Sequence, residues 1–130
     1  MHWRAKEFSE TLTDADWLSE SDARVVYDRV TPLMSRDHYG LEATAVRDLQ
    51  RIPADAAATD WLSSRIPQDE SLLLIFGSRE VCRVPAWAFH EHWQDLFCPS
   101  RDDVVIISER GGWILFYCHE DEFEYGEPMA

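Results

Sequence analysis

The chain has 130 residues, of which 45% are hydrophobic, and it carries 25 acidic against 12 basic residues for a formal net charge of -13. That length and hydrophobic content suit a folded domain with a core of its own and exclude a chain that is disordered for lack of apolar residues. The charge excludes ordinary nucleic-acid binding, which relies on basic residues that displace phosphate counterions, and no segment approaches the ~20 apolar residues of a membrane span.

Residues 1–70 are predicted to be mainly helical. A helix is expected to begin at residues 13–16 or 19–22, because each stretch offers a capping hydroxyl followed by acidic residues. Apolar residues then recur at helical spacing, with Pro32 inside the pattern. Proline breaks a helix interior but suits a first turn, so the helix either ends near Arg29 or gives way to a new short helix at Pro32.

Two further helices are predicted in this half. Leu41, Ala45 and Leu49 fall on one face of a helical wheel, which predicts an amphipathic helix over residues 41–50. The apolar residues of 61–66 predict another, shorter helix that ends at the proline that follows.

The second half of the chain is predicted to be rich in β-strands. Residues 72–76 are a compact apolar run, 77–78 read as a turn and 80–84 alternate, which is typical of a β-hairpin. Pro85 then begins a helix that carries an aromatic stripe. Residues 103–118 read as a second hairpin with a glycine-containing turn.

The last strand is predicted at residues 122–126, where charged and aromatic residues alternate, as in an edge strand with its charges outward. Together the elements predict a single α+β domain over residues 1–130. The helical N-terminal half, 1–70, is expected to pack on an antiparallel sheet from 71–130. That sheet consists of two hairpins with a helix between them, followed by the short edge strand.

The densest charge lies at the end of the sequence. Residues 119–130 contain five acidic residues and no Lys or Arg, so they supply -5 of the net charge, against -5 for residues 1–60 and -3 for residues 61–118. Charge of this kind bears on solubility and on the sign of a partner rather than on the fold. It predicts a basic protein partner.

Aromatic residues alternate with these acids, and aromatic anchors ringed by carboxylates suit an interface with an Arg- or Lys-rich groove. The predicted partner-binding residues are Glu120, Asp121, Glu122, Glu124 and Tyr125, with Asp102 and Asp103 as a second patch. Three tryptophans fit the apolar stripes poorly and are candidates for exposed anchors, namely Trp3, Trp61 and Trp87. The alternative is that the acids only solvate an edge strand and that these tryptophans are partly buried.

Candidate catalytic or metal-binding residues are few. His90 and His92 are two apart, which places them on different sides of a helix, whereas helical zinc ligands are usually four apart. Cys118 and His119 offer further ligands without a supporting Cys-x-x-Cys or His-x-x-x-His spacing. We therefore predict no catalytic residue, metal or other cofactor, and keep a small metal enzyme built on these four residues as an alternative.

Localisation is predicted from the cysteines and the first residues. Cys82, Cys98 and Cys118 are odd in number and irregularly spaced, which favours free thiols in a reducing compartment. Residues 1–7 contain charges and lead into no apolar stretch of the kind that a signal peptide needs. We expect a cytoplasmic protein that does not associate with a membrane.

One part of the chain resembles known small proteins. The pattern comprises Val-Pro-Ala-Trp-Ala-Phe at 84–89, Trp-Gln-Asp-Leu-Phe at 93–97, Asp-Asp-Val-Val-Ile at 102–106 and an aromatic, acidic ending at 119–126. Residues 80–126 thereby resemble small bacterial proteins, among them uncharacterised families and immunity proteins of toxin–immunity pairs. The resemblance implies an intracellular inhibitor that binds and blocks a toxin domain.

The function predicted from the sequence is therefore an acidic, immunity-type inhibitor that occludes a basic toxin or effector domain, such as a nuclease. The first alternative is an inhibitor that imitates nucleic acid and blocks a DNA-binding machine, since mimicry also requires acidity. The others are the small metal enzyme and a structural or regulatory subunit.

Overall fold

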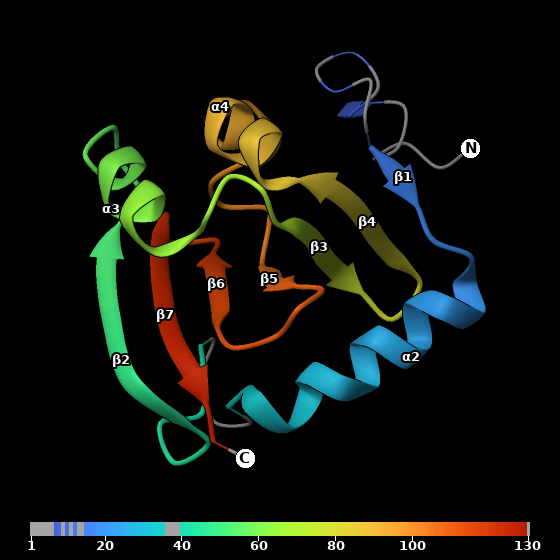
Figure 1. The fold of residues 1–130 in the computed structure, drawn as a ribbon, viewed down its shortest axis with the longest axis horizontal. Coiled ribbons are helices and arrows are strands. Elements are labelled where there is room, and N and C mark those ends of the chain that lie inside the picture. Colours follow the sequence, from blue (N-terminus) through green and yellow to red (C-terminus); the bar gives the residue numbers. More distant parts are fainter. Residues whose placement is uncertain (1–6, 9, 11, 13–14, 36–39, 130) are drawn as a thin grey trace.

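Across the residues that it describes, 7–8, 10, 12, 15–35 and 40–129, the computed structural model forms one seven-stranded antiparallel sheet with helices on both faces (Figure 1). The strands are β1 (Asp16–Trp17), β2 (Val46–Pro53), β3 (Ser71–Gly77), β4 (Glu80–Pro85), β5 (Val104–Ser108), β6 (Ile114–Cys118) and β7 (Glu122–Pro128). The helices are α2 (Glu20–Val30), the 3-10 turn η1 (Thr31–Leu33), α3 (Ala58–Arg65) and α4 (Ala86–Leu96). The strand order is β1-β4-β3-β5-β6-β7-β2, which confirms the predicted α+β class.

Two hydrophobic cores lie on opposite faces of the sheet, one under α3 and α4 and the other under α2. Because side chains alternate along a strand, β6 sends Leu115 and Tyr117 towards α4 and Ile114 and Phe116 towards α2. Coverage of both faces explains why β3, β5 and β6 read as unbroken apolar runs in the sequence.

Helix α2 begins at the second of the two predicted sites. The side chain of Ser19 accepts a hydrogen bond from the backbone N–H of Asp22 at 3.2 Å and caps the helix. The other predicted helix start, residues 13–16, is wrong at Asp16, because this residue lies in strand β1. Thr13 and Asp14 lie outside the described residues. The helix ends at Val30, close to the predicted end at Arg29, and Pro32 lies in the first turn of the short helix η1. The helix end and the new short helix, predicted as alternatives, therefore both occur.

The predicted helix over residues 41–50 is wrong, because its second half, residues 46–50, belongs to strand β2 and its first half contains an isolated bridge at Leu41 and a turn. Its strand signal is hidden by a bulge: the register with β7 shifts between Arg47 and Gln50, and Asp48 has a left-handed φ of 54°. The extra residue breaks the two-residue alternation and leaves Leu49 40% exposed. Leu41, Ala45 and Leu49 are spaced four residues apart, and this spacing is what suggested one face of a helix.

The predicted edge position of the last strand is also wrong. Strand β7 pairs with β6 on one side and with β2 on the other, so the edges of the sheet are β1 and β2. The described residues among the first 70 therefore supply two strands as well as helices α2 and α3, and most of them are not helical. No helix among the described residues has the length and apolar character to cross a membrane.

The close contact of β7 with β2 generates a test. A Cβ added at Gly126 would lie 2.9 Å from Cβ and Cγ2 of Val46, so Gly126→Ala forces the two strands apart. We expect this variant to lose about 1–3 kcal/mol of unfolding free energy in urea denaturation, as overpacked cores do.

The matched control is Gly77→Ala, whose added Cβ would meet no heavy atom within 4 Å. We expect its unfolding free energy to stay within about 0.5 kcal/mol of the wild-type value. Equal stability of the two variants would mean that β2 does not pack against β7 as described.

Candidate functional site

The candidate site is the end of the sheet where β2 and β6 finish and β7 begins, towards the top of Figure 1. Three segments are joined there by backbone hydrogen bonds. The N–H of Ala54, just after β2, donates to the carbonyl of Asp121 at 2.8 Å, and the N–H of Ser100, before β5, donates to the carbonyl of His119 at 2.7 Å. We call this site the acidic end and define it by the partly or fully exposed residues Asp55, Asp103, Glu120, Asp121 and Glu122.

The turn from β6 to β7 has a defined backbone conformation. Cys118 pairs with Glu122 across a three-residue loop, and the N–H of Asp121 donates to the carbonyl of Cys118 at 2.9 Å. Asp121 has φ 62°, in the left-handed region that aspartate tolerates. A turn followed by one left-handed residue is a common three-residue hairpin connection.

Side chains hold the turn as well. The hydroxyl of Tyr117 donates to Oδ1 of Asp121 at 2.8 Å, and burial together with this hydrogen bond raises the pKa of Tyr117. Oδ1 of Asp103 accepts the backbone N–H of His119 at 2.8 Å. The carboxylates of the acidic end are therefore attached to a backbone fixed by neighbouring loops.

Glu124, a predicted partner-binding residue, is instead buried and serves the fold. One carboxylate oxygen accepts the N–H of Leu41 at 2.7 Å, and the other accepts Nε of Arg51 at 2.8 Å as well as its Nη2. The side chain is only 5% exposed, whereas that of Arg51 is 55% exposed. Glu124 is on β7 but points into the face covered by α2, so it presents no carboxylate to a partner.

Asp102 is likewise buried, in contrast to its prediction as a surface acid. Its carboxylate forms a two-pronged pair with Arg101, at 2.8 Å to both Nε and Nη2, and also accepts the N–H of Cys98 at 2.8 Å. Arg101 extends further to Glu7, and these contacts, chiefly the one with Asp102, raise the pKa of the guanidinium. Asp103, next along the chain, is half-buried and remains part of the acidic end.

Tyr125 is half-buried in an aromatic cluster rather than presented as an anchor. Its ring stacks on Trp113 with centroids 6.2 Å apart and meets Trp61 edge-on at 6.0 Å, and the Arg65 guanidinium lies over both Trp61 and Tyr125. Trp61 is thus partly buried, which agrees with the alternative to its being an exposed anchor. Trp87 is 46% exposed, and Trp3 lies outside the described residues.

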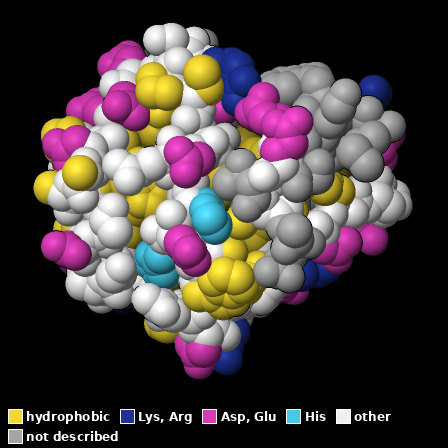
Figure 2. All heavy atoms as spheres, turned by 90° about the horizontal axis from the view of Figure 1, so that it is seen from above, with side chains coloured by type: hydrophobic (Ala, Val, Ile, Leu, Met, Phe, Trp, Pro, Cys, Tyr) yellow, Lys and Arg dark blue, Asp and Glu magenta, His cyan; other side chains and the backbone are white. Residues whose placement is uncertain are grey.

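The charge balance explains why this end is acidic. Arg51 is paired chiefly with Glu124 and Arg101 chiefly with Asp102, so the strongest contact of each cation is with a buried carboxylate, although Arg101 also reaches Glu7 and Glu122 acts on Arg51 more weakly. Figure 2 shows this end from above, with acidic side chains spread over the described surface and basic ones towards its margins. Sequence reasoning missed Asp55, because its place beside Asp121 depends on the strand β2 that was read as a helix.

A second cluster lies within this end. Potential metal-ligand atoms of Asp103, Cys118 and His119 all lie within 4.8 Å of one another, and Nδ1 of His119 is 2.9 Å from Oδ1 of Asp103. Burial raises the pKa of Cys118, and the negative charges of nearby carboxylates add to this rise, although the backbone N–H of Glu120 opposes it. The arrangement therefore does not favour a nucleophilic thiolate.

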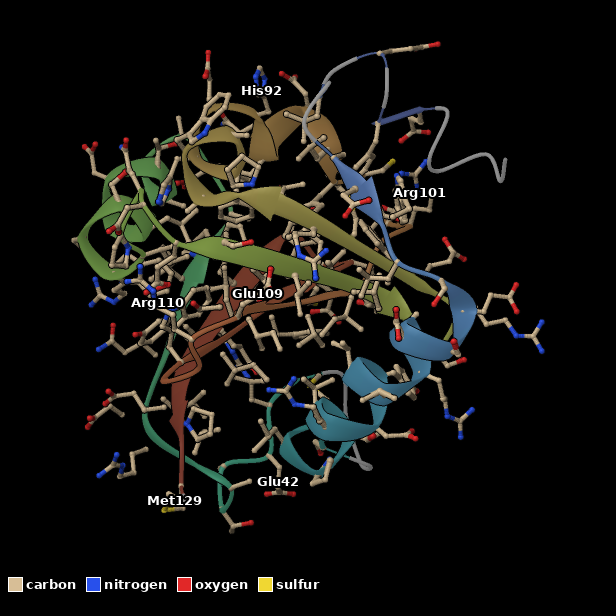
Figure 3. The ribbon with its side chains drawn as sticks, turned by 45° about the vertical axis from the view of Figure 1, so that its right-hand side comes forward. Glu42, His92, Arg101, Glu109, Arg110 and Met129 are labelled. Carbon is tan, nitrogen blue, oxygen red and sulfur yellow. The ribbon has the colours of Figure 1, made fainter. Side chains whose placement is uncertain are left out.

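The four metal ligands of the alternative reading, a small metal enzyme, are not brought together. His90 is buried and its Nε2 lies 2.8 Å from the carbonyl of Ile66, whereas His92 projects from the outer side of α4 (Figure 3). Neither belongs to the cluster that holds Cys118 and His119. Sequence reasoning missed Asp103 as their neighbour, since only the register of β5 with β6 brings it there.

No protein-family model matches the chain, and no curated protein matches it. The resemblance of residues 80–126 to immunity proteins therefore stays a prediction. Many of its motif residues are buried in the core under α4, including Phe89, Trp93 and Phe97, and so describe packing rather than a site.

The burial of Glu124 predicts an asymmetric response to removal of charge. In Glu124→Gln the new NH2 group faces either the Arg51 guanidinium or the N–H of Leu41, so in either orientation two donors meet where a donor and an acceptor stood. We expect a loss of about 1.5–3 kcal/mol in unfolding free energy, as for hydrogen bonds to charged groups. Glu120→Gln, at an exposed position of the adjacent turn, should change stability by no more than about 0.5 kcal/mol. Similar losses would contradict the different roles of these two glutamates.

Thiol reactivity is a second test. Cys98 is exposed, whereas Cys82 and Cys118 are buried, and burial raises the pKa of Cys82 to about 12. Treating the folded protein with a chromogenic disulfide reagent at mildly alkaline pH should modify one thiol rapidly and the other two only after denaturation. Cys98→Ser should abolish the rapid phase, and its persistence would contradict the described burial.

Proposed function

We propose that the chain is an acidic binding protein that engages a basic surface of a partner protein, acting as an immunity-type inhibitor that occludes a toxin or effector domain. The observation that carries the proposal is the acidic end: five carboxylates on three segments that hydrogen bonds hold together. The basic residues beside it, Arg51 and Arg101, are paired with buried acids. A cationic partner is what this surface complements.

The fixed backbone of this end supports binding rather than mere solubility. A surface that is ordered before binding loses less conformational entropy on association than a flexible tail does. The turn of β6 and β7 is held at the carbonyls of His119 and Asp121 and through the side chain of Asp121. Its charges therefore meet a partner in one arrangement, which favours specificity as well as affinity.

Net charge supplies the second support. The whole chain carries -13, and a field of one sign draws an oppositely charged partner and raises the association rate. For electrostatically steered pairs this rate reaches about 10⁸ M⁻¹s⁻¹ or more at low salt. Rapid capture suits an inhibitor that must neutralise a harmful enzyme, and inhibition by occlusion requires no bond to be made or broken.

A bacterial, cytoplasmic setting belongs to the same proposal. The three cysteines of the sequence are all free thiols, two of them buried, which fits a reducing compartment. Absence of a nucleic-acid ligand and of membrane association are further parts of the proposal that the charge supports.

The test compares two charge-matched variants as baits for affinity capture from the source cells. Glu120→Gln, Asp121→Asn and Glu122→Gln together remove three charges from the acidic end. Glu20→Gln, Asp48→Asn and Asp69→Asn together remove three charges elsewhere. We expect the wild type and the second variant to retain the same basic protein and the first variant to lose it, because only the first alters the interface.

The purified partner then allows the association rate to be measured against salt concentration. The rate with wild-type protein should fall steeply with salt, and the first variant should show a flatter dependence. Capture of a neutral or acidic partner, or equal behaviour of both variants, would remove the acidic end from consideration. Displacement of the partner by duplex DNA would instead indicate mimicry of nucleic acid.

A further inference from the structure

We propose that Asp103, Cys118 and His119 form a binding site for a divalent transition-metal ion of the zinc type. Their donor atoms, a carboxylate oxygen, a sulfur and an imidazole nitrogen, lie within 4.8 Å of one another. These are the three kinds of protein ligand that zinc takes. The inference does not depend on the proposed partner, because it rests on donor geometry rather than on net charge.

The spacing is close to that of a bound ion. Tetrahedral zinc with bonds of about 2.0–2.3 Å holds its donors about 3.3–3.8 Å apart. Donors as far apart as 4.8 Å would therefore have to approach by about 1.0–1.5 Å, whereas Nδ1 of His119 and Oδ1 of Asp103, 2.9 Å apart, would have to separate slightly if both bound the ion. The side chains of His119 and Asp103 are 31% and 34% exposed, so they have room to move while Cys118 stays fixed on β6.

The backbone orients two of the three donors. Oδ1 of Asp103 accepts the backbone N–H of His119. Among the described residues no hydrogen bond reaches Oδ2 of Asp103. Oδ2 can therefore face an ion while Oδ1 keeps its hydrogen bond to the backbone. Sγ of Cys118 accepts the N–H of Glu120 at 3.2 Å, a contact typical of metal-bound thiolates in turns that donate their amides. The hairpin supplies this arrangement whether or not a metal is bound.

The register of the sheet explains why these residues meet. Val104 pairs with Tyr117, so Asp103 and Cys118 occupy the next position along the same two strands. His119 follows as the first residue of the turn. Ligands on adjacent strands and a three-residue loop give a more precise site than ligands on long loops do.

Charge and access also suit a cation. The carboxylates of Glu120 and Glu122 lie close enough to act on Cys118, so the ion would enter a negative field. Asp103 lines an open cavity of about 990 Å³ between α2 and the sheet, whose wall includes Val105 and Phe116. Three protein ligands would leave a fourth position for water, and Asp103 is the one of the three that lines this cavity.

The experiment treats the 130-residue chain with a chelator and then titrates it with Co²⁺ and afterwards with Zn²⁺. Cobalt reports its ligands: a thiolate ligand gives a near-ultraviolet charge-transfer band, and tetrahedral geometry gives intense visible bands. We expect one equivalent of Co²⁺ to produce both, and Zn²⁺ to displace it. Competition with a chromogenic chelator measures the zinc affinity.

Variants assign the ligands. Cys118→Ser should abolish the charge-transfer band, and His119→Gln and Asp103→Asn, at half-exposed positions, should each lower zinc affinity by about tenfold or more. The controls are Cys98→Ser and His92→Gln, the other free thiol at this end and an outward-facing histidine, which should leave binding unchanged. Circular dichroism verifies that each variant is folded.

The outcomes are distinct from those of the partner test. Absence of cobalt binding, or a charge-transfer band that survives Cys118→Ser and is lost in Cys98→Ser, would overturn the metal site. Unchanged affinity in both His119→Gln and Asp103→Asn would do the same. None of these results alters the expectation for the acidic-end variant in affinity capture.

Discussion

The buried carboxylate of Glu124 is the interaction on which one side of the sheet depends. A charge removed from water is costly unless it is paired and hydrogen-bonded. Glu124 meets this requirement only when Arg51 of β2 and the N–H of Leu41 lie beside it. Gly40 leaves room for this approach, since a Cβ there would lie 2.7 Å from the carboxylate. The segment from Gly40 to Arg51 is thereby held against β7. Without β2, strand β7 would be the edge of the sheet; with β2 paired to it, β7 is an interior strand.

The composition of the acidic end follows from that arrangement. Docking of β2 carries Ala54 to the carbonyl of Asp121, so Asp55 joins the turn between β6 and β7. Alternation along β7 then divides its residues, with Phe123 and Tyr125 on the α4 side and Glu124 on the α2 side. The carboxylates left at the surface are those of the turn and its neighbours. A dense acidic sequence thus separates into a structural charge inside and a cluster of charges outside.

Local signals predicted what depends on neighbours in the chain, and the failures arose where distant residues decide. Strands β3 to β6 and helix α4 lie within a residue or two of their expected limits, because apolar runs, turn residues and Pro85 mark them. Strand β2 was missed because the bulge at Asp48 hides its alternation. The structural role of Glu124 was missed because its partners lie 73 and 83 residues away. Asp103 was anticipated as a surface acid, but its place beside His119 was missed because only strand register brings the two together. In the acidic end, Glu120, Asp121 and Glu122 were anticipated, since a turn exposes its residues whatever the sheet does.

The proposed metal and the proposed partner share this end, and charge decides whether they are compatible. Zinc brings two positive charges, while Cys118, a thiol when metal-free, loses one proton on coordination, so the net change is a single positive charge. The five carboxylates of the acidic end then retain four net negative charges. Asp103 would be drawn towards the ion, but Asp55, Glu120, Asp121 and Glu122 keep the positions that the backbone gives them. The attraction for a basic surface is therefore reduced rather than reversed, and a bound ion would brace the turn that presents these charges.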